Sequence, residues 1–326
     1  MPKVFTTSSI FSIILIALAA SVSLMAQSAN EIISWSRGPD ISLPRGGYFA
    51  TWYQGGLWIA GGSYWKNGEK LWTDETSFYD PKANTWSKLK PIPRRIGYGI
   101  TAVIGKDLYL LGGADSEGNL NRDIYRLRAG QWRTVGKSPA GFVFPAFAVI
   151  GSRIYVFGGS ASATDVTKST NDTWVYNAET HRWSRLKAIP GPPRQIFSSA
   201  AIGKTIYVFG GVTQEPGEQF ANLDDAYRLD TRTGKWIPLK KLPRPMRAFW
   251  AVSDGSFVYL IGGYGDSGLN TVYRYSPLSD SYELVSTLPQ PLMDTKFIYN
   301  DGIFYGASGE DKPASRFQGL VIGSIK

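Results

Sequence analysis

The chain of 326 residues has no cysteine and a single histidine, His181. The absence of cysteine excludes disulfide bonds, thiolate metal ligands and a cysteine nucleophile. One histidine argues against a histidine-based catalytic triad or a multi-histidine metal site, and we expect neither a metal nor a cofactor. His181 itself lies in a predicted turn beside Trp183, where we expect it to be a solvated turn residue.

Runs of like charge are also missing. Lysine and arginine outnumber aspartate and glutamate by 35 to 26, but they are scattered along the chain. A nucleic-acid-binding protein concentrates its basic residues in one patch or stripe, so we expect no nucleic-acid partner. The net charge of +9 remains compatible with a basic mouth that attracts an anionic ligand.

A long apolar run occurs only near the start, from Ile10 to Leu24, after Lys3 and before Met25-Ala26-Gln27. A basic start, a short apolar stretch and small residues near a cut are typical of a secretory signal peptide. We predict a signal peptide at 1–26 and a single domain at 27–326, which is exported to the periplasm or secreted and has no membrane span. The alternative is an uncleaved anchor, although a span needs about 20 apolar residues.

One short sequence motif occurs six times along the chain. Its clearest copy runs from Arg153 to Gly159 and ends in two glycines, and a degraded sixth copy runs from Ile303 to Ala307. The other copies end at Gly61-Gly62, Gly112-Gly113, Gly210-Gly211 and Gly262-Gly263. If Gly306 leads the sixth copy, the leading glycines are 51, 46, 52, 52 and 44 residues apart. A period of this length indicates a repeat fold.

An aromatic residue recurs with the same period. A tryptophan stands 26 or 27 residues before each of the first five leading glycines (Trp35, Trp86, Trp132, Trp183 and Trp236), and Tyr282 stands 24 before Gly306. Each repeat also contains four β-like runs that are separated by turn residues. Four antiparallel strands repeated six times predict an all-β, six-bladed β-propeller.

The two ends of the chain complete each other in this scheme. No full repeat precedes Trp35, and the last repeat lacks its outer strand. We therefore predict that an N-terminal strand around Trp35 pairs with residues 319–325 and closes the ring, which removes an open sheet edge. The glycine pair, the aromatic residue and the tryptophan at these spacings resemble the kelch repeat over residues 35–325. Such a repeat specifies a fold far better than a function.

The long polar loops between the second and third strands share one face with the links between blades. Function usually lies on such loops. Arginines stand where the links enter the innermost strands, and we expect them to converge on the mouth of the central channel and to bind a carboxylate or phosphate: Arg45, Arg95, Arg194 and Arg247. Alternatively, they bond neighbouring backbone carbonyls. Trp65 and Tyr98 either stack on a ligand or belong to the blade core.

The last of these loops, from Gly309 to Arg316, contains two acids, Lys312 and Arg316. Composition alone favours a solvated charged loop. The pattern Gly-Glu-x-Lys-Pro-x-x-Arg resembles a motif of the bacterial kelch-type N-acetylneuraminate epimerases, which are sialic acid mutarotases. The long first loop, 61–74, resembles the cyclically permuted branch of that family. The resemblance implies that Glu310 transfers the proton, that Arg316 is required for activity, and that no cofactor takes part.

We therefore expect an exported mutarotase that interconverts the anomers of an acidic sugar by acid–base ring opening. The arginines, Lys312, Trp65 and Tyr98 would bind the substrate. The alternative is a non-catalytic kelch propeller that binds an acidic glycan or a protein partner and has no need of Glu310. Two other enzymes are excluded, because a sialidase carries repeated Ser-x-Asp-x-Gly-x-x-Trp turns and a galactose oxidase-like copper enzyme needs a cysteine.

Overall fold

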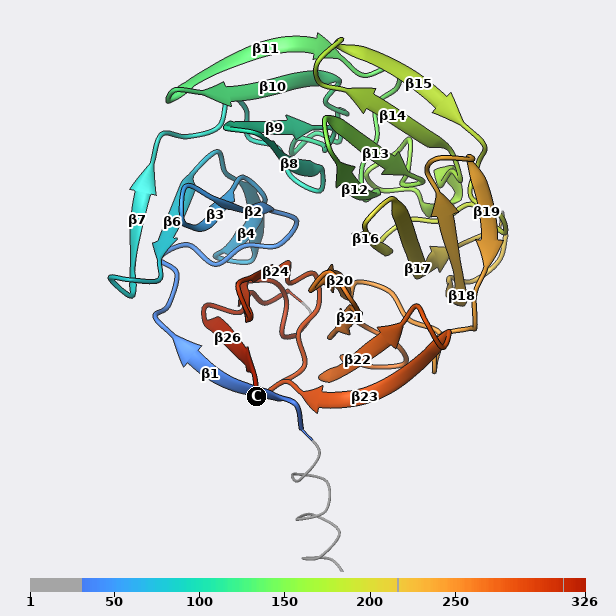
Figure 1. The fold of residues 1–326 in the computed structure, drawn as a ribbon. Coiled ribbons are helices and arrows are strands. Elements are labelled where there is room, and N and C mark those ends of the chain that lie inside the picture. The colour runs from blue at the N-terminus through green and yellow to red at the C-terminus, as the bar shows by residue number, and fades with distance from the viewer. Residues whose placement is uncertain (1–30, 216, 313) are drawn as a thin grey trace, which may run out of the picture.

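Six four-stranded antiparallel sheets stand around a central axis in the computed structural model (Figure 1), which describes residues 31–215, 217–312 and 314–326. The all-β, six-bladed propeller is therefore confirmed. The predicted signal peptide at 1–26 lies outside the described residues. Within them, no helix has the length and apolar character that a membrane span requires.

The first five blades each use one continuous stretch of chain, with their strands in sequence order outward from the axis, and in blade 1 a separate hairpin stands between the second and third strands. Blade 1 consists of β2 (Phe49–Tyr53), β3 (Gly56–Ala60), β6 (Thr76–Asp80) and β7 (Thr85–Leu89), and blade 2 of β8 (Ile100–Ile104), β9 (Asp107–Leu111), β10 (Asp123–Arg128) and β11 (Gln131–Lys137). Blade 3 consists of β12 (Ala146–Ile150), β13 (Arg153–Phe157), β14 (Thr173–Asn177) and β15 (Arg182–Leu186), and blade 4 of β16 (Ser198–Ile202), β17 (Thr205–Thr213), β18 (Ala221–Asp230) and β19 (Lys235–Pro238). Blade 5 consists of β20 (Trp250–Ser253), β21 (Val258–Ile261), β22 (Thr271–Ser276) and β23 (Ser281–Thr287).

The sixth blade is built from both ends of the described chain. Its strands are β24 (Phe297–Asn300), β25 (Ile303–Ala307), β26 (Leu320–Ile325) and, outermost, β1 (Ile33–Gly38). Strand β1 pairs antiparallel with β26, and Trp35 lies opposite Gly323. The Trp35 ring packs on Phe297 and Phe304, with centroids 5.9 and 6.2 Å away. A Cβ at Gly323 would lie 2.4 Å from that ring, so glycine is needed there. The predicted closure is confirmed.

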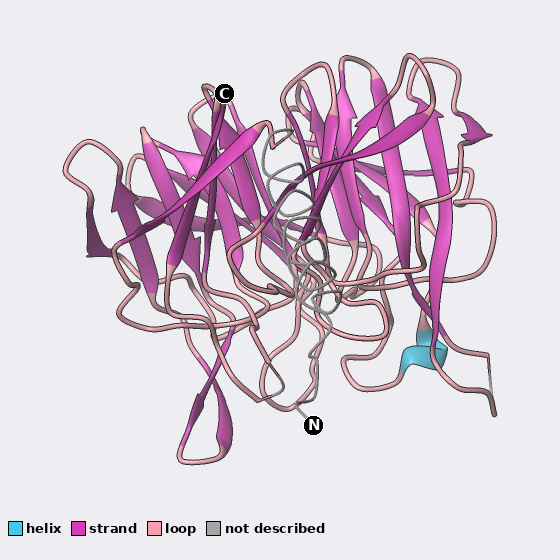
Figure 2. Ribbon diagram, turned by 90° about the horizontal axis from the view of Figure 1, so that it is seen from below, coloured by secondary structure: helices cyan, strands magenta, loops and turns pink. Residues whose placement is uncertain are grey.

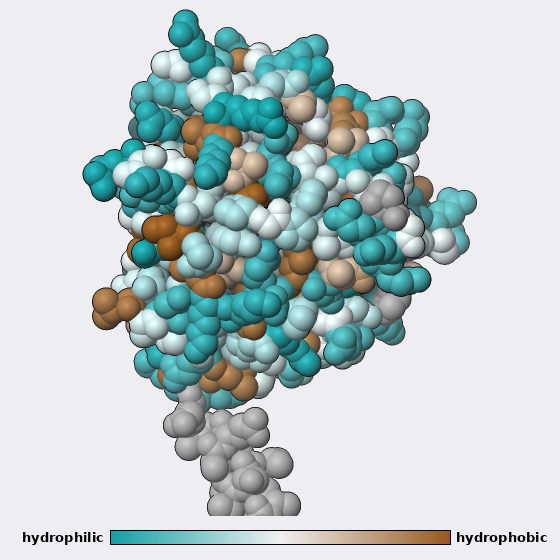
Figure 3. All heavy atoms as spheres, turned by 90° about the vertical axis from the view of Figure 1, so that its right-hand side faces the viewer, coloured by the Kyte–Doolittle hydropathy of each residue, from teal (hydrophilic) through white to brown (hydrophobic). Residues whose placement is uncertain are grey.

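The hydrophobic core follows the same symmetry. It consists of six clusters of buried side chains, and each cluster lies between two neighbouring blades. On the outer side around blades 3 and 4, polar side chains dominate and hydrophobic ones are scattered (Figure 3). The blades are therefore held together by their flanks, which leaves the two ends of the channel free for other roles.

The glycine pair of the sixth blade was predicted at the wrong place. In blades 1 to 5 the second glycine of the pair donates its N–H to a carbonyl in the next inter-blade link, as Gly62 does to Ile96 at 2.9 Å. In blade 6 this donor is Gly309, which bonds the Arg45 carbonyl at 3.0 Å. Ser308, at φ 64°, takes the place of the leading glycine. With this alignment Tyr282 stands 26 residues before the leading residue, in step with most of the tryptophans.

A ring of backbone hydrogen bonds surrounds the axis. One residue of each blade, just before the innermost strand, has a φ between 51° and 63°: Gly47, Tyr98, Phe144, Ile196, Ala248 and Asp294. From Tyr98 onward, each donates its N–H to the carbonyl of the preceding member, and Asp294 does so to Ala248 at 2.9 Å. The last bond differs, because the Gly47 N–H goes to the side-chain carboxylate of Asp294. We call these six residues the axial ring.

The two ends of the channel differ in their loops. Figure 2 shows short turns at one end and long connections at the other. From this loop face projects a hairpin made of β4 (Ser63–Lys66) and β5 (Glu69–Trp72), which leaves blade 1. The 3-10 turn Val166–Lys168 of blade 3 lies on the same face.

Removal of the Trp35 side chain tests the closure. We expect Trp35→Ala to lower the free energy of unfolding by about 3 kcal/mol, because the ring leaves a cavity between the outer strand and the core. Trp65→Ala, on the projecting hairpin, should change it by no more than about 0.5 kcal/mol. Urea unfolding of the three proteins measures both values, and equal stability of Trp35→Ala and wild type would contradict the closure.

Candidate functional site

A pocket of about 410 Å³ opens at the loop-face end of the channel. Its lining residues are Tyr98, Phe144, Ile196, Arg247, Ala248, Tyr264, Met293, Asp294 and Glu310. We call it the mouth pocket. Its walls are largely aromatic and aliphatic, with a few charged groups, which is the usual composition of a ligand site.

The lining comes from three positions that every blade repeats. One is the axial ring residue, the second is the residue before it, and the third is the residue after the glycine pair. Backbone bridges join the second and third positions, as between Arg247 and Tyr264 and between Met293 and Glu310. Because the backbone is the same in every blade, the side chains at these positions decide the chemistry of the mouth.

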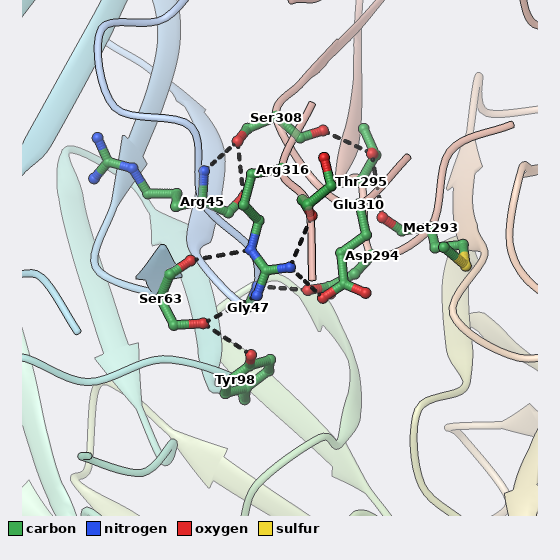
Figure 4. Close-up of polar contacts among 11 residues, drawn as sticks. Arg45, Gly47, Ser63, Tyr98, Met293, Asp294, Thr295, Ser308, Glu310 and Arg316 are labelled. Carbon is green, nitrogen blue, oxygen red and sulfur yellow. Dashed lines mark hydrogen bonds and ion pairs between the residues drawn. The ribbon is translucent and has the colours of Figure 1, made fainter. Parts of the chain in front are cut away.

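The acidic side of the pocket belongs to blade 6. The Glu310 carboxylate accepts a hydrogen bond from Arg316 Nη1 at 2.7 Å, and Arg316 Nε also donates to the Ser63 carbonyl at 3.2 Å (Figure 4). Arg316 thereby connects blade 6 with blade 1. Burial raises the pKa of Glu310, with a contribution from the Asp294 charge, and burial also raises the pKa of Asp294. Arg316 and Lys70 partly oppose both shifts.

The basic side belongs to blade 5. The Arg247 guanidinium lies 4.6 Å from the centre of the Tyr264 ring and donates to the side-chain oxygen of Asn222. Asn222 is itself fixed, because its amide nitrogen donates to the Gly265 carbonyl at 3.0 Å. Among the described residues, no carboxylate lies within 4.0 Å of Arg247. The mouth therefore contains one cation, the Arg247 guanidinium, that neutral side chains hold in place and that has no acidic partner among the described residues.

The projecting hairpin adds a second cation. Lys70 of β5 lies 5.2 Å from the ring centre of Tyr98 and 5.0 Å from that of Trp72. The hydroxyl of Tyr98 is 3.0 Å from that of Ser63, at the base of the same hairpin. These contacts place the hairpin against the rim of the mouth pocket.

Two of the predicted arginines do not reach the mouth. Arg45 and Arg194 are fully buried. Arg194 binds both carboxylate oxygens of Asp225, at 2.5 and 2.6 Å, and Arg45 binds the carboxylate and carbonyl of Glu75, at 3.2 and 2.7 Å. Burial lowers the pKa of Arg45 to about 10, against the opposing charge of Glu75.

The reason lies in the position of these arginines along the link. Arg45 and Arg194 stand two residues before the axial ring, where the other blades have Ile96, Phe142, Met246 and Leu292. Those four side chains are buried in the clusters between blades. Both arginines therefore replace core residues and bond carbonyls and acids there, which is the alternative left open by the sequence.

The remaining predicted residues divide into two groups. Arg95 is largely exposed, with its Nε 3.8 Å from Asp74, and Lys312 is exposed as well. Trp65 is 37% exposed on the hairpin. Tyr98, Arg247 and Glu310 line the mouth pocket, and Arg316 lies behind Glu310 with its side chain buried.

Several residues of the mouth were not predicted. They are Phe144, Ile196, Ala248, Tyr264, Met293 and Asp294. A signal for the axial ring is present in the sequence, because each ring member stands 14 residues before the leading residue of a glycine pair, as Tyr98 does before Gly112. Across 31–215, 217–312 and 314–326, no three histidine, aspartate or glutamate side chains gather as a metal site would require.

Comparison with known proteins finds kelch repeats. The sequence model described as the KLHDC2/KLHL20/DRC7 Kelch-repeats domain matches residues 47–194 and 97–296. Kelch-like protein 25 of Xenopus tropicalis is 30% identical over 124 residues, which are 38% of this chain and 20% of that protein. Kelch-like protein 35 of Mus musculus is 27% identical over 140 residues, 42% of this chain and 23% of that protein.

Kelch domain-containing protein 10 of Xenopus tropicalis is 31% identical over 131 residues, 36% of this chain and 30% of that protein. The matched part thus spans less than a third of the length of each of these relatives.

The expectation of a mutarotase is wrong. The matching family is a kelch-repeat domain, and the relatives above are Kelch-like and Kelch domain-containing proteins, not isomerases. The catalytic roles of Glu310 and Arg316 and the acidic sugar as substrate lose their basis with it. In the structure, the charged loop that suggested them ties blade 6 to blade 1 through Arg316.

Substitution of a buried arginine should lower the free energy of unfolding much more than substitution of an exposed one. We expect Arg194→Met to lower the free energy of unfolding by about 3–5 kcal/mol, because Asp225 is left without its ion pair. Arg95→Met removes the same charge from the surface and should change the value by no more than about 0.5 kcal/mol. Urea unfolding compares them, and similar losses would show that Arg194 is not held as described.

The raised pKa of Asp294 predicts a pH effect on stability. The folded state binds its proton more strongly than the unfolded state, so its contribution to stability is present at low pH and is lost as pH rises through the folded-state pKa. Asp294→Asn keeps an acceptor for the Gly47 N–H but does not titrate. Its unfolding free energy, relative to wild type, should therefore increase between pH 4 and pH 7. Asp266→Asn, at an exposed position, is the control, and a parallel pH profile for Asp294→Asn and wild type would refute the effect.

Proposed function

The chain belongs to the KLHDC2/KLHL20/DRC7 Kelch-repeat family, and from this premise we propose that it is a non-catalytic propeller whose loop face binds a segment of a protein partner. One observation supports this proposal most directly. The mouth pocket combines apolar walls with a guanidinium, that of Arg247, which is held by Asn222 and Tyr264 but has no carboxylate partner among the described residues.

Two β-ribbons flank this mouth. The first is the hairpin β4–β5 of blade 1, and the second is the part of β17–β18 that extends past the glycine pair of blade 4, with Thr213 opposite Ala221. Blades 1 and 4 lie on opposite sides of a six-membered ring (Figure 1). Trp65 lies on the first ribbon and is 37% exposed, and Phe220 lies directly before β18 of the second and is 60% exposed. Such side chains are common anchors at protein interfaces.

The charge of the mouth indicates the polar group of the partner. Arg247 lacks a counter-charge, and Lys70 adds a second cation at the rim, whereas Glu310 is already paired with Arg316. A carboxylate from an aspartate or glutamate would form a charge-assisted, two-point contact with Arg247. We infer that the partner segment carries an acidic residue between apolar ones, which contact the aromatic walls and the ribbons.

Selection from a random peptide library on the purified propeller tests this function. Selected peptides should contain acidic residues, and their affinity can be measured by fluorescence anisotropy. Arg247→Ala should weaken binding at least tenfold, since truncation of one partner of a buried charge pair costs about 2–5 kcal/mol. Arg95→Ala is the matched control on the exposed surface and should bind as wild type does.

Two results would contradict the proposal. One is selection of peptides whose binding is unchanged by Arg247→Ala and by the double substitution Trp65→Ala, Phe220→Ala. The other is the absence of selected peptides together with saturable, Arg247-dependent binding of N-acetylneuraminate, which would show a glycan module instead.

A further inference from the structure

Lys296 is a buried lysine in the axial channel, below the mouth pocket. It is 6% exposed, and its backbone N–H donates to the Tyr48 hydroxyl at 2.9 Å. Its ammonium nitrogen lies 5.8 Å from the ring centre of Tyr48 and 5.4 Å from that of Trp250. The charge thus sits between a ring of blade 1 and a ring of blade 5, on a residue of blade 6.

The ammonium has no protein acceptor in the described part of the chain. No side chain or carbonyl hydrogen-bonds its nitrogen, and no carboxylate lies within 4.0 Å of it. An ammonium has three N–H donors, and a buried charge without a partner is costly. Contacts with aromatic faces contribute only about 1–2 kcal/mol, which does not replace the lost hydration. The ammonium nitrogen is not fully closed off from the channel, so water or an ion there supplies its acceptors.

The channel provides space for such an acceptor. A second cavity of about 50 Å³ is lined by Lys296, by Asp294 and by aromatic side chains that include Trp250, Phe147 and Phe197. It shares five axial ring residues with the mouth pocket, so the ring forms the waist between the two cavities. About 10–15 Å³ of such free space admits one water, so the cavity has room for one small ion or a few waters.

The charges around the axis favour the ion. Four cationic side chains surround the two cavities, whereas only two carboxylates do: Lys70, Arg247, Lys296 and Arg316 against Asp294 and Glu310. Both carboxylates are already bound, Asp294 by the Gly47 N–H and Glu310 by Arg316. The cations thus exceed the carboxylates by two charges, and Asp294 is the carboxylate whose charge acts on Lys296.

We propose that the axial channel binds one small monovalent anion, of the size of chloride, through the Lys296 ammonium. This anion site is distinct from the mouth pocket and does not depend on the function proposed above. Because only the folded chain brings Lys296, Tyr48 and Trp250 together, the anion stabilises the folded state, and the stabilisation grows with the logarithm of the anion concentration once this exceeds the dissociation constant. It thereby helps to hold blade 6 between its two neighbours, where the ring closes.

The location of the anion can be tested directly on the wild-type protein. Crystals grown in sodium bromide should show an anomalous peak within about 3.5 Å of the Lys296 nitrogen, which is the reach of a hydrogen bond to a large ion. A channel that contains only water in these crystals would overturn the proposal. This measurement needs no variant, so it holds even if substitution of Lys296 prevents folding.

Thermal unfolding tests the linkage. Replacement of sodium gluconate by sodium chloride at constant ionic strength should raise the Tm of the wild type progressively with chloride concentration, on the order of 2–4 °C. Lys296→Met should lose this rise, and Lys204→Met, which removes the same charge from an exposed turn, should keep it. A rise of equal size in Lys296→Met, or none in the wild type, would refute the site.

The pH dependence gives a third criterion. Burial lowers the pKa of Lys296 to about 8, while the Asp294 charge opposes this shift. An anion binds the protonated amine and raises its pKa, so the chloride effect should decline as pH rises above about 8. Asp294 and Tyr48 are the other titratable groups that face the ammonium, and burial raises the pKa of the Asp294 carboxyl and of the Tyr48 hydroxyl. A chloride effect that persists unchanged at high pH would point to another site.

Discussion

The axial ring is the constraint on which the rest of the molecule depends. Five of its six members are not glycine, yet all have left-handed backbone angles, which cost a non-glycine residue about 1–2 kcal/mol. The cost is met because each member donates its N–H to the neighbouring blade and because the chain must turn there from the link into the innermost strand. The ring thus fixes blade spacing, the width of the channel and the direction of the side chains that line it.

The ring also explains why charged groups gather at the seam between blades 6 and 1. Five ring bonds join consecutive members, but the sixth must join the last repeat to the first, and there the Asp294 carboxylate replaces a carbonyl. Ser308 replaces a glycine at the same seam, and its hydroxyl donates to the Arg45 carbonyl at 2.7 Å. Arg316 and Tyr48 complete the connection. The loop that resembles a catalytic motif is therefore part of the closure of the propeller.

The sequence allowed the fold to be predicted because its signals are backbone requirements. Glycine pairs with positive φ and tryptophans at a constant spacing define the blades, and Trp35 identifies the closing strand. Even the error at Gly306 arose because serine took up a backbone shape that glycine holds elsewhere. The site was harder to predict, since it depends on which way a side chain points. Arg247 stands one residue before its ring member and faces the mouth, whereas Arg194 stands two before and is buried.

A shift of one residue therefore separates an arginine that can bind a ligand from one that supports the core. Consecutive residues of an extended chain point to opposite sides. The presence of an arginine in the link therefore does not show whether its side chain faces the mouth or the core. Once the ring is placed, the distinction becomes a matter of counting back from the glycine pair. It then follows that three positions per blade line the mouth pocket, and that substitutions at these positions can change what the pocket binds while the backbone of every blade stays the same. Function in this chain is thus carried by side chains that the fold repeats in position but not in chemistry.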